Sequence, residues 1–531
     1  MKSKVICTSL LVEKSPQALP LGAACIASAI KNNQLTKDII QTQVLTFTLE
    51  DKNLALKNSD TEKADYIYQA LIENKAEIVC FSTFVWNRNI FELTSKLLKA
   101  KGIITIAGGP EVTAHPQELK KSFDYLVSGE GEVKVPFLVK AIINKEEIKS
   151  LPADTLSLED LQSPYLDGSI DPAEFGGALW ELARGCPFKC SYCYESKGEK
   201  KVRLFPMKRI EKELDLFAKK NIAQVFVLDP TYNINKDRAI KLIDLIAKKT
   251  PDTFYYFEAR AEYIDRQLAR AFTKIPCALQ IGLQSANEES LKLVNRPFNR
   301  KQFVKNINLL NQEGVIFGLD LIYGLPAETY KSFREGINFA LSLYPNNLEI
   351  FCLSVLPGTD LFDRAKELKL NFEDKPPYHV INTDRFSAED IKHAEELTLA
   401  CNYFYNDGHA VPWFNTICQS LKIKSDLFLK RFYSYAKENK ISLGCQTPHL
   451  EIEKNQIKFV NSLYQEKGLV KYIKAANDII RFNGALSRKT ECGKTQEIQL
   501  NYPVEYINSE FSLNLEFFVS NVKMKSGKIR I

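Results

Sequence analysis

Long apolar runs and blocks of like charge are both absent from this chain of 531 residues. No segment reaches the roughly 18 consecutive apolar residues that a membrane-spanning helix needs. The short apolar start, Met1–Leu10, runs into polar sequence, unlike a signal peptide. The 71 basic and 65 acidic residues leave a net charge of +6, without the concentrated basic patch typical of nucleic-acid-binding proteins. We therefore expect a cytoplasmic protein that neither spans a membrane nor takes a nucleic acid as its partner.

Histidine is also scarce, with five in the chain and none between His115 and His379. Cysteine is not scarce: there are 12, which in a cytosolic protein indicate thiols or metal ligands rather than disulfides. Cys186, Cys190 and Cys193 stand close together in the sequence, and three thiolates suit an iron–sulfur cluster. A structural zinc site normally takes four protein ligands, so the cluster is favoured over zinc or a reactive thiol.

Residues 1–148 alternate short apolar runs with segments of helical periodicity. The predicted strands are Val5–Leu10, Val44–Thr48, Ile78–Ser82, Ile103–Ala107 and Tyr125–Val127, and the predicted helices are Ala18–Asn32, Glu62–Asn74, Asn89–Lys101, Pro116–Ser122 and Glu132–Ile143. Repeated strand–helix units imply a parallel sheet covered on both faces. We predict a doubly wound, Rossmann-like α/β domain, which binds ligands at the carboxyl ends of its strands.

A proline-bearing linker over residues 149–177 is expected to lead into a second strand–helix series at 178–372. Its predicted strands are Ala178–Ala183, Gln224–Leu228, Phe254–Glu258, Ala278–Leu283, Gly318–Tyr323 and Asn347–Leu353. Six such units fit a partial (β/α)6 barrel whose site lies in the loops after the strands.

Residues 373–531 are expected to form a C-terminal domain that is mostly helical and then ends in a small sheet. The helices are predicted over Ala388–Tyr405 and Asp426–Asn439, and alternating apolar and polar residues predict strands within Ile498–Tyr506 and Phe511–Val522. We expect this domain to cover the mouth of the barrel.

The cysteine segment has a specific spacing. Its pattern, Cys-x3-Cys-x-aromatic-Cys, is met by Cys186, Cys190, Tyr192 and Cys193. The chain here resembles the radical S-adenosylmethionine (SAM) superfamily, in which three cysteines hold a [4Fe-4S] cluster. The resemblance implies that SAM chelates the fourth iron, that one electron from a donor such as flavodoxin or ferredoxin cleaves it, and that a 5′-deoxyadenosyl radical results.

The resemblance extends beyond the cysteines, to the ends of the later predicted strands. It implies SAM contacts from residues that match the family's positions: Tyr192, Asp229, Glu258, Arg260, Gln284, Ser285, Gly324 and Leu325. The chemistry is sensible for this ligand, because glutamate accepts from ribose hydroxyls and arginine pairs with a carboxylate. Each of these residues alone also has a plain structural explanation, but their order at successive strand ends favours the SAM site.

The first domain resembles the cobalamin (B12)-binding domain that precedes many radical SAM barrels. The matching loop residues implied to contact cobalamin are Ser82, Thr83, Gly108, Gly109, Gly129, Glu130 and Gly131. One departure is clear: the loop after the first strand, Leu11–Gln17, contains no histidine to ligate cobalt from below. Either cobalamin binds without a protein ligand to the metal, with Leu11 and Val12 as an apolar floor, or the domain is a scaffold that binds none.

Cys7, Cys25 and Cys80 invite comparison with methylthiotransferases, which carry a second cluster on three N-terminal cysteines. These three lie within apolar strands and an apolar helix face, so core packing is the better interpretation.

Three hypotheses about function follow. The leading one is a cobalamin-assisted radical SAM enzyme that methylates or rearranges an unactivated carbon of a small-molecule or peptide substrate. The second is a radical SAM enzyme whose first domain holds no cofactor and whose chemistry is not methylation. The third is a non-enzymatic iron–sulfur electron-transfer or sensor protein, which would have no need of the SAM-site residues.

Overall fold

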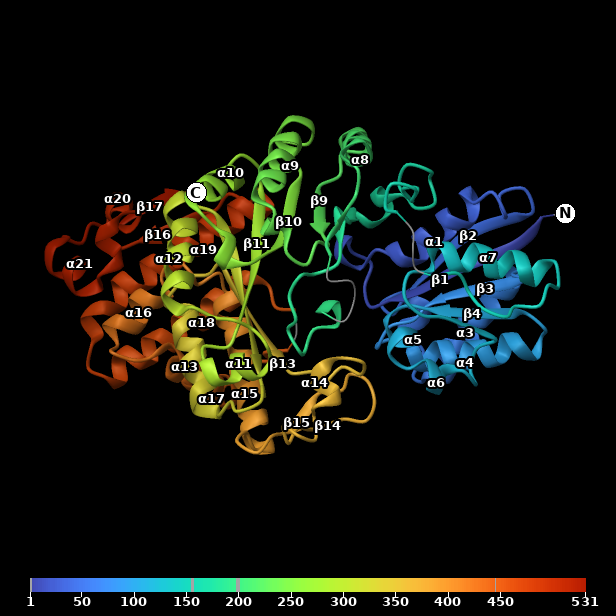
Figure 1. Cartoon of the computed structure of the whole chain (residues 1–531). Helices are drawn as coiled ribbons and strands as arrows, with labels where there is room; N and C mark the ends of the chain where they lie inside the picture. Colours follow the sequence, from blue (N-terminus) through green and yellow to red (C-terminus); the bar gives the residue numbers. More distant parts are fainter. Residues whose placement is uncertain (1, 154–156, 197–200, 445) are drawn as a thin grey trace.

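The computed structural model of the chain describes residues 2–153, 157–196, 201–444 and 446–531. Figure 1 shows the N-terminal α/β unit on the right, the strand–helix barrel in the middle and the C-terminal helices on the left. Within the described part of the chain, no helix is both long and apolar enough to cross a membrane.

The N-terminal unit is built on a five-stranded sheet in which every strand pair is parallel. The strand order is β2-β1-β3-β4-β5, with β1 at Ser3–Leu11, β2 at Ile40–Thr48, β3 at Ile78–Ser82, β4 at Ile104–Gly108 and β5 at Tyr125–Val127. The order reverses beside β1, and such a switch point opens a crevice at the carboxyl ends of the strands.

Helices cover both faces of this sheet, as the doubly wound prediction requires. One apolar core joins the sheet to α1 (Leu21–Asn32) and α7 (Gly131–Ile143), and a second joins it to α3 (Asp60–Glu73) and α4 (Arg88–Ala100). Short helices α2 (Lys52–Ala55), α5 (Pro110–Ala114) and α6 (Pro116–Leu119) fill the connections.

The second sheet has six parallel strands in the order β13-β12-β11-β10-β9-β6. The strands are β6 (Gly177–Trp180), β9 (Gln224–Val227), β10 (Phe254–Ala259), β11 (Cys277–Gln284), β12 (Ile316–Tyr323) and β13 (Asn347–Cys352). Its outer helices are α8 (Met207–Lys219), α9 (Lys236–Lys249), α10 (Arg266–Phe272), α11 (Glu288–Leu293), α12 (Arg300–Glu313) and α13 (Tyr330–Leu341). The end strands β6 and β13 do not pair with each other, so the barrel is open on one side, as expected.

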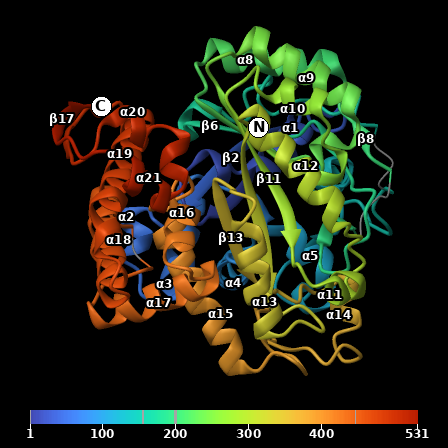
Figure 2. The same ribbon diagram turned by 90° about the vertical axis from the view of Figure 1, so that its left-hand side faces the viewer.

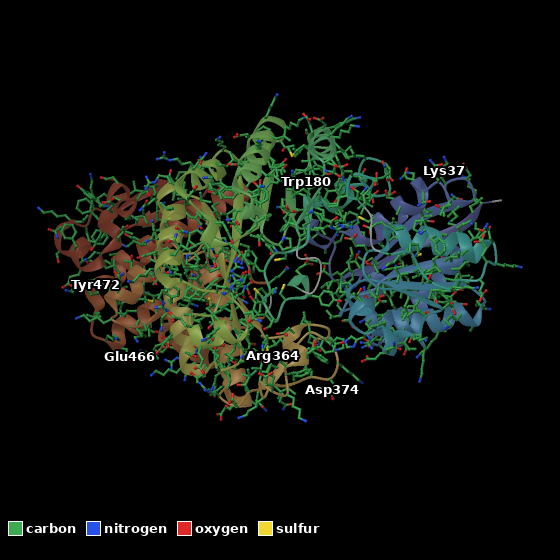
Figure 3. All side chains as sticks on the ribbon, in the orientation of Figure 1. Lys37, Trp180, Arg364, Asp374, Glu466 and Tyr472 are labelled. Carbon is green, nitrogen blue, oxygen red and sulfur yellow. The ribbon has the colours of Figure 1, made fainter. Side chains whose placement is uncertain are left out.

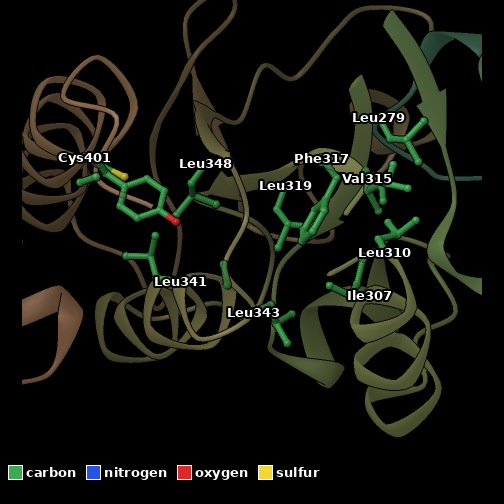
Figure 4. Packing of buried hydrophobic residues seen from close by; sticks show 14 of the residues in the cluster. Leu279, Ile307, Leu310, Val315, Phe317, Leu319, Leu341, Leu343, Leu348 and Cys401 are labelled. Carbon is green, nitrogen blue, oxygen red and sulfur yellow. The ribbon is translucent and has the colours of Figure 1, made fainter. Parts of the chain in front are cut away.

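Strand β11 shows how the barrel sorts its side chains. Its residues alternate between buried and partly accessible over the whole strand, because successive side chains point to opposite faces. The buried set packs outward, and Figure 4 shows Leu279 facing Ile307 and Leu310 of α12. The other set points into the barrel, where polar side chains are available to a ligand.

The C-terminal helices share one core with the barrel. They are α15 (Ala388–Cys401), α16 (Phe414–Ser420), α17 (Ser425–Glu438), α18 (His449–Glu466) and α19 (Ile473–Cys492). Cys401 at the end of α15 is fully buried and lies beside Leu341 and Leu348 of the barrel. Figure 2 shows α18 and α19 side by side beyond the open edge next to β13.

The end of the chain differs from the prediction, since the helix α20 (Val504–Ile507) overlaps the first predicted stretch and β17 lies outside both. A two-stranded sheet forms from β16 (Glu497–Leu500) and β17 (Gly527–Arg530), but the strand predicted within Phe511–Val522 is wrong. This stretch contains the helix α21 (Leu515–Asn521), started by Asn514, whose side chain accepts from the Phe517 amide. Leu515 and Phe518 are buried at helical spacing, and a run this short does not distinguish strand from helix.

Candidate functional site

The loop with the three cysteines follows β6 and lies over the mouth of the barrel. Trp180, labelled in Figure 3, anchors β6 by donating from its indole nitrogen to Glu213 at 2.8 Å. Beyond it, the Ser191 amide donates to the Val294 carbonyl at 3.0 Å and the Leu361 amide donates to the Ser191 carbonyl at 2.8 Å. The loop is therefore held by segments that follow β11 and β13, far away in the sequence.

The donor set of this loop fits an iron–sulfur cluster. Cys186, Cys190 and Cys193 form no disulfide, and Cys190 is the most buried of them at 6% exposed. Among the residues that the structure describes, no three histidine, cysteine, aspartate or glutamate side chains are placed to hold one metal ion. Three thiolates that each bind a different iron atom suit a cluster, whereas zinc draws its four ligands around a single centre.

Arg260 follows β10 and is aimed at the cysteine loop. Its guanidinium carbon lies 3.8 Å from the ring centre of Phe188, in the stacked arrangement that arginine prefers on aromatic faces. One terminal nitrogen donates to Glu262 at 3.1 Å, while Nη1 is buried without a partner in the structure. A buried guanidinium N–H without an acceptor is costly, so this atom fits the carboxylate of a bound amino acid moiety.

Two carboxylates point into the barrel beside Arg260. Glu258 lies on β10, and burial together with the charges of Asp320 and Glu195 raises its pKa to about 7. Asp320 lies on β12, where burial raises its pKa to about 6 although the Gln280 amide donates to it. Both lie at the mouth of the barrel, where hydroxyl or ammonium groups of a ligand would relieve their mutual repulsion.

Gln284 and Ser285 end β11 at a bulge. Gln284 has a φ of +68°, in the left-handed region that side chains rarely adopt, and the register of β11 against β12 shifts at this point. Ser285 donates to the buried carboxyl of Glu328 at 2.7 Å, which burial holds at a pKa of about 8. Glu328 thus ties the end of β11 to the loop after β12.

Gly324 and Leu325 begin this same loop. Leu325 is fully buried in a small core with Leu353 and Val380. Gly324 has a φ of +84°, and a Cβ there would lie 2.5 Å from Cγ1 of Val380. The glycine is therefore required by packing as well as by the backbone, whatever contact it makes with adenine.

We expect Gly324→Ala to destabilise the protein by about 1–3 kcal/mol, because both strain and collision oppose the new methyl group. Gly314→Ala is the matched control, since Gly314 has a φ of +73° but nothing within 4 Å of its Cβ position. The midpoints of urea unfolding measure both variants. Equal losses at the two glycines would contradict the packing argument.

Asp229 has a role that the sequence did not show. One carboxylate oxygen accepts from the Leu182 amide at 2.8 Å and from the Ala183 amide at 2.9 Å, and burial raises its pKa to about 7. These bonds hold the turn between β6 and β7 (Ala183–Arg184), directly before the cysteines. A contact with the methionyl amine of SAM stays a prediction.

Arg296 is a site residue that sequence reasoning missed. One guanidinium nitrogen donates to the Gly282 carbonyl, and Nη1 lies 3.8 Å from the sulfur of Cys190. Tyr192 is half-buried in the cysteine loop, and its hydroxyl oxygen lies close enough to Arg296 to interact with it. An arginine in the irregular loop after α11 carries no sequence signal, because only the fold brings it to the cysteines.

The residues predicted to contact cobalamin lie around a cavity. A space of about 890 Å³ opens at the carboxyl ends of β1, β3 and β4, and its far wall is formed by the barrel and the cysteine loop. Six of the seven predicted contact residues line it: Ser82, Gly108, Gly109, Gly129, Glu130 and Gly131. The cavity thus joins the two predicted cofactor sites.

Thr83 is the exception, because it does not line the cavity. It is fully buried, and its carbonyl oxygen lies 2.7 Å from the position of a Cβ on Gly109. Gly109, with a φ of +106°, is therefore needed to bring β4 close to Thr83. This backbone approach places both loops at the edge of the cavity.

Apolar side chains form one side of the cavity, and no histidine is among them. Leu11 and Val12 line it as expected, and Phe84 and Trp86 add a stacked pair with ring centres 4.5 Å apart. Trp86 was missed in the sequence, where a tryptophan after a strand has no specific meaning. His115 lies elsewhere, 3.2 Å from Glu118 and 3.4 Å from the Tyr378 hydroxyl.

Cys7 and Cys80 are core residues, whereas Cys25 is partly accessible. Cys7 and Cys80 are opposite each other on β1 and β3, are 0% and 7% exposed, and belong to the core beneath α1 and α7. Cys25 lies on α1, where burial raises the pKa of its thiol. All three also border the cavity of about 890 Å³, and among the described residues no three side chains of the metal-binding types are grouped to hold one metal ion.

Comparison with protein families finds two matches in this chain. Residues 180–340 match the radical SAM superfamily, and residues 10–139 match the B12 binding domain. Both ranges fall within the two sheets and helices that surround the cavity.

Two curated relatives are both methyltransferases by name. The cobalamin-dependent radical SAM methyltransferase TokK of Streptomyces tokunonensis is 25% identical over 334 residues, which cover 54% of this chain and 48% of TokK. The 2-(S-pantetheinyl)-carbapenam-3-carboxylate methyltransferase of Streptantibioticus cattleyicolor is 27% identical over 342 residues, which again cover 54% of this chain and 48% of the relative. The chain spans about half the length of these relatives.

Solved structures support the fold over more of the chain. The cobalamin-dependent SAM radical enzyme OxsB, with aqua-cobalamin and SAM bound, matches with a TM-score of 0.58 at 13% identity and covers 93% of this chain and 81% of its own. The SAM methyltransferase TsrM from Kitasatospora setae, with cobalamin and a [4Fe-4S] cluster bound, matches with a TM-score of 0.56 at 14% identity and covers 72% and 83%.

Proposed function

Because this chain belongs to the radical SAM superfamily and carries a B12-binding domain, we propose that it is a cobalamin-dependent radical SAM methyltransferase. It would act on an unactivated carbon of a small-molecule or peptide substrate. The single observation that carries this proposal is the shared cavity, whose walls come from the cobalamin-type loops on one side and from Arg184, Gly185 and Glu195 near the cysteines on the other.

When bound, the cofactors would supply the reactive chemistry: one SAM molecule the methyl group, which cobalamin would carry, and a second SAM molecule, cleaved with one electron from the cluster, the radical. The chain's own residues bind and orient. Cys186, Cys190 and Cys193 would hold the cluster, and Arg260 would pair with the SAM carboxylate through its free Nη1. Glu258 would accept from the ribose and Gln284 would donate to it, since they lie near the ends of the neighbouring strands β10 and β11.

The names of the relatives favour methylation over rearrangement, because TokK and the carbapenam enzyme are both methyltransferases. A cofactor-free first domain is disfavoured by the open, glycine-lined cavity of about 890 Å³. A sensor is disfavoured by the buried, unpartnered guanidinium nitrogen of Arg260 beside the cysteine loop, since a sensor needs no ligand there. A reductant such as flavodoxin or ferredoxin would supply the electron.

Anaerobic reconstitution tests the proposed function. The protein is loaded with iron, sulfide and hydroxocobalamin, desalted, and mixed with SAM and a reductant. We expect about one cobalamin retained per chain by absorbance, and both S-adenosylhomocysteine and 5′-deoxyadenosine by mass spectrometry. A protein that cleaves SAM but retains no cobalamin would overturn the methyltransferase assignment and favour the cofactor-free alternative.

We predict that bound cobalamin has no imidazole nitrogen on cobalt. The apolar side of the cavity offers Leu11, Val12, Phe84 and Trp86, and His115 lies outside it. Electron paramagnetic resonance of the cobalt(II) state should therefore show no axial nitrogen splitting from the protein. Splitting that disappears in His115→Ala would contradict this prediction.

A further inference from the structure

Two arginines face each other beside the cavity. The short strand β7 pairs antiparallel with β8 (Arg203–Leu204), and this register places Arg184 directly opposite Arg203. Like charges at opposed positions of a ladder repel, so the pair needs a shared anion. Arg184 also stands two positions before Cys186, the first predicted cluster ligand.

The shared anion comes from the other domain. Glu130 accepts from Arg203 at 3.2 Å and lies 3.4 Å from Arg184. Arg184 is further bound by Glu132 at 2.7 Å and by Glu181 at 2.9 Å. Glu130 and Glu132 begin α7 of the N-terminal domain, so the two arginines clamp that domain to the cysteine loop.

The environment keeps this clamp charged. Arg184 and Arg203 have side chains only 15% and 22% exposed, where ion pairs are screened less than at the surface. Burial raises the pKa of Glu130, but the hydrogen bond from Arg203 and the charge of Arg184 outweigh it and leave the pKa below its usual value. Glu130 is therefore ionised at neutral pH and holds both arginines.

The position of the clamp gives it a consequence for the reaction. Glu130 lies between Gly129 and Gly131 in a loop that lines the cavity, and Arg184 lines the same cavity from the barrel side. A short path thus runs from the cobalamin-type loop through Glu130 and Arg184 to the cysteine loop. Methyl and radical chemistry on one substrate needs the two cofactors at a fixed separation, since small displacements cost large factors in rate.

We propose that Arg184, Arg203 and Glu130 form a positioning clamp that sets the distance between the cobalamin site and the cluster. The inference rests on the proposed function, because it assigns the clamp to that same pair of sites. Arg184 is a positioning residue here and not a ligand of either cofactor. Glu130, whose contact with cobalamin stays a prediction, lines the cavity and also acts through its two arginines.

A second contact of the N-terminal domain, with the segment that follows the barrel, provides a control. Tyr378 donates to Glu111 at 3.3 Å and accepts from Arg88 at 3.3 Å. Tyr378 does not line the cavity. Tyr378→Phe therefore removes a hydrogen bond between the domains without touching the clamp.

The test measures the separation of the two cofactors directly. The full chain is loaded with a [4Fe-4S] cluster and hydroxocobalamin, partly reduced so that both centres are paramagnetic, and studied by pulsed dipolar spectroscopy. We expect one narrow distance distribution in the wild type and a clearly broader one in Glu130→Gln and in Arg184→Gln. The double variant should be at least as broad as either single variant, because Arg184→Gln also removes the pair with Glu132 and Glu130→Gln also removes the pair with Arg203. Tyr378→Phe should match the wild type.

A second readout separates positioning from plain loss of stability. S-adenosylhomocysteine formation depends on both cofactors, whereas 5′-deoxyadenosine formation depends on the cluster and SAM alone. We expect the ratio of the first product to the second to fall about tenfold in Arg184→Gln, the effect of one lost charge-assisted hydrogen bond. Arg184→Lys, which keeps one charge, should recover part of the ratio, and it also serves if the glutamine variant does not fold.

The outcomes are distinct. Unchanged distance distributions in folded, loaded variants, or a parallel fall of both products, would overturn the clamp and leave the proposed function standing. A wild-type protein that retains no cobalamin would overturn the proposed function, and the clamp with it.

Discussion

Replacing Cys186, Cys190 or Cys193 with alanine is expected to abolish the cluster and all 5′-deoxyadenosine formation. Each cysteine supplies one thiolate, and a cubane with only two protein ligands loses iron readily. The expected loss is complete, rather than a fraction of the wild-type rate.

Iron and sulfide content, the absorbance of the reconstituted protein and 5′-deoxyadenosine by mass spectrometry measure this effect. Cys492→Ala is the matched control, because Cys492 is exposed at the end of α19, far from the barrel mouth. It should retain full iron and full activity. A triple variant of the loop cysteines that still cleaves SAM would refute the assignment of the cluster.

Replacing Arg260 with alanine is expected to weaken SAM binding about ten- to hundredfold without loss of iron, since a charge-assisted hydrogen bond contributes about 1.5–3 kcal/mol. Arg260 is 6% exposed, stacks on Phe188 and has one buried N–H group without an acceptor. The guanidinium is thus held ready for an anion, and little conformational entropy is lost when a carboxylate arrives.

Equilibrium dialysis of reconstituted protein with SAM measures the affinity. Arg266→Ala is the matched control, because the Arg266 side chain is 55% exposed and contacts Glu313 and Gln312, away from the cysteine loop. Arg260→Lys should lie between wild type and alanine, since lysine keeps the charge but not the planar stack. Unchanged affinity in Arg260→Ala would mean that this arginine serves the fold or the substrate.

Parts of the site that depend on local sequence were predictable. The spacing of the cysteines lies within one loop. The ends of the strands follow from the apolar runs of the parallel strands, because a buried parallel strand is apolar along its whole length. Ile78–Ser82 and Tyr125–Val127 were predicted with the bounds that the structure shows. Gly109 and Gly324 were expected to allow a close approach to a cofactor. In the structure, a Cβ at these positions would collide with Thr83 and Val380, respectively.

Other features depend on which distant segments meet. Arg296 reaches Cys190 across 106 positions of sequence, and Trp86 borders the cavity only because β3 lies between β1 and β4. Glu328 is an ordinary acid in the sequence and becomes a buried partner of Ser285 in the fold. The strand predicted within Phe511–Val522 is wrong because a short aromatic run is compatible with the period of a strand and with that of a helix. Packing against the helical core favours the helix.

The sequence by itself determined the two α/β units, the cysteine motif and the order of the strand-end positions, because periodicity and motif spacing are local properties. Only the tertiary structure decided how the two units face each other across one cavity of about 890 Å³. It alone placed Glu130 between Arg184 and Arg203. Ion pairs between domains leave no local pattern in the sequence, because a charged residue looks the same whether it faces water or a partner. Only the fold shows which charged residues are buried beside an opposite charge.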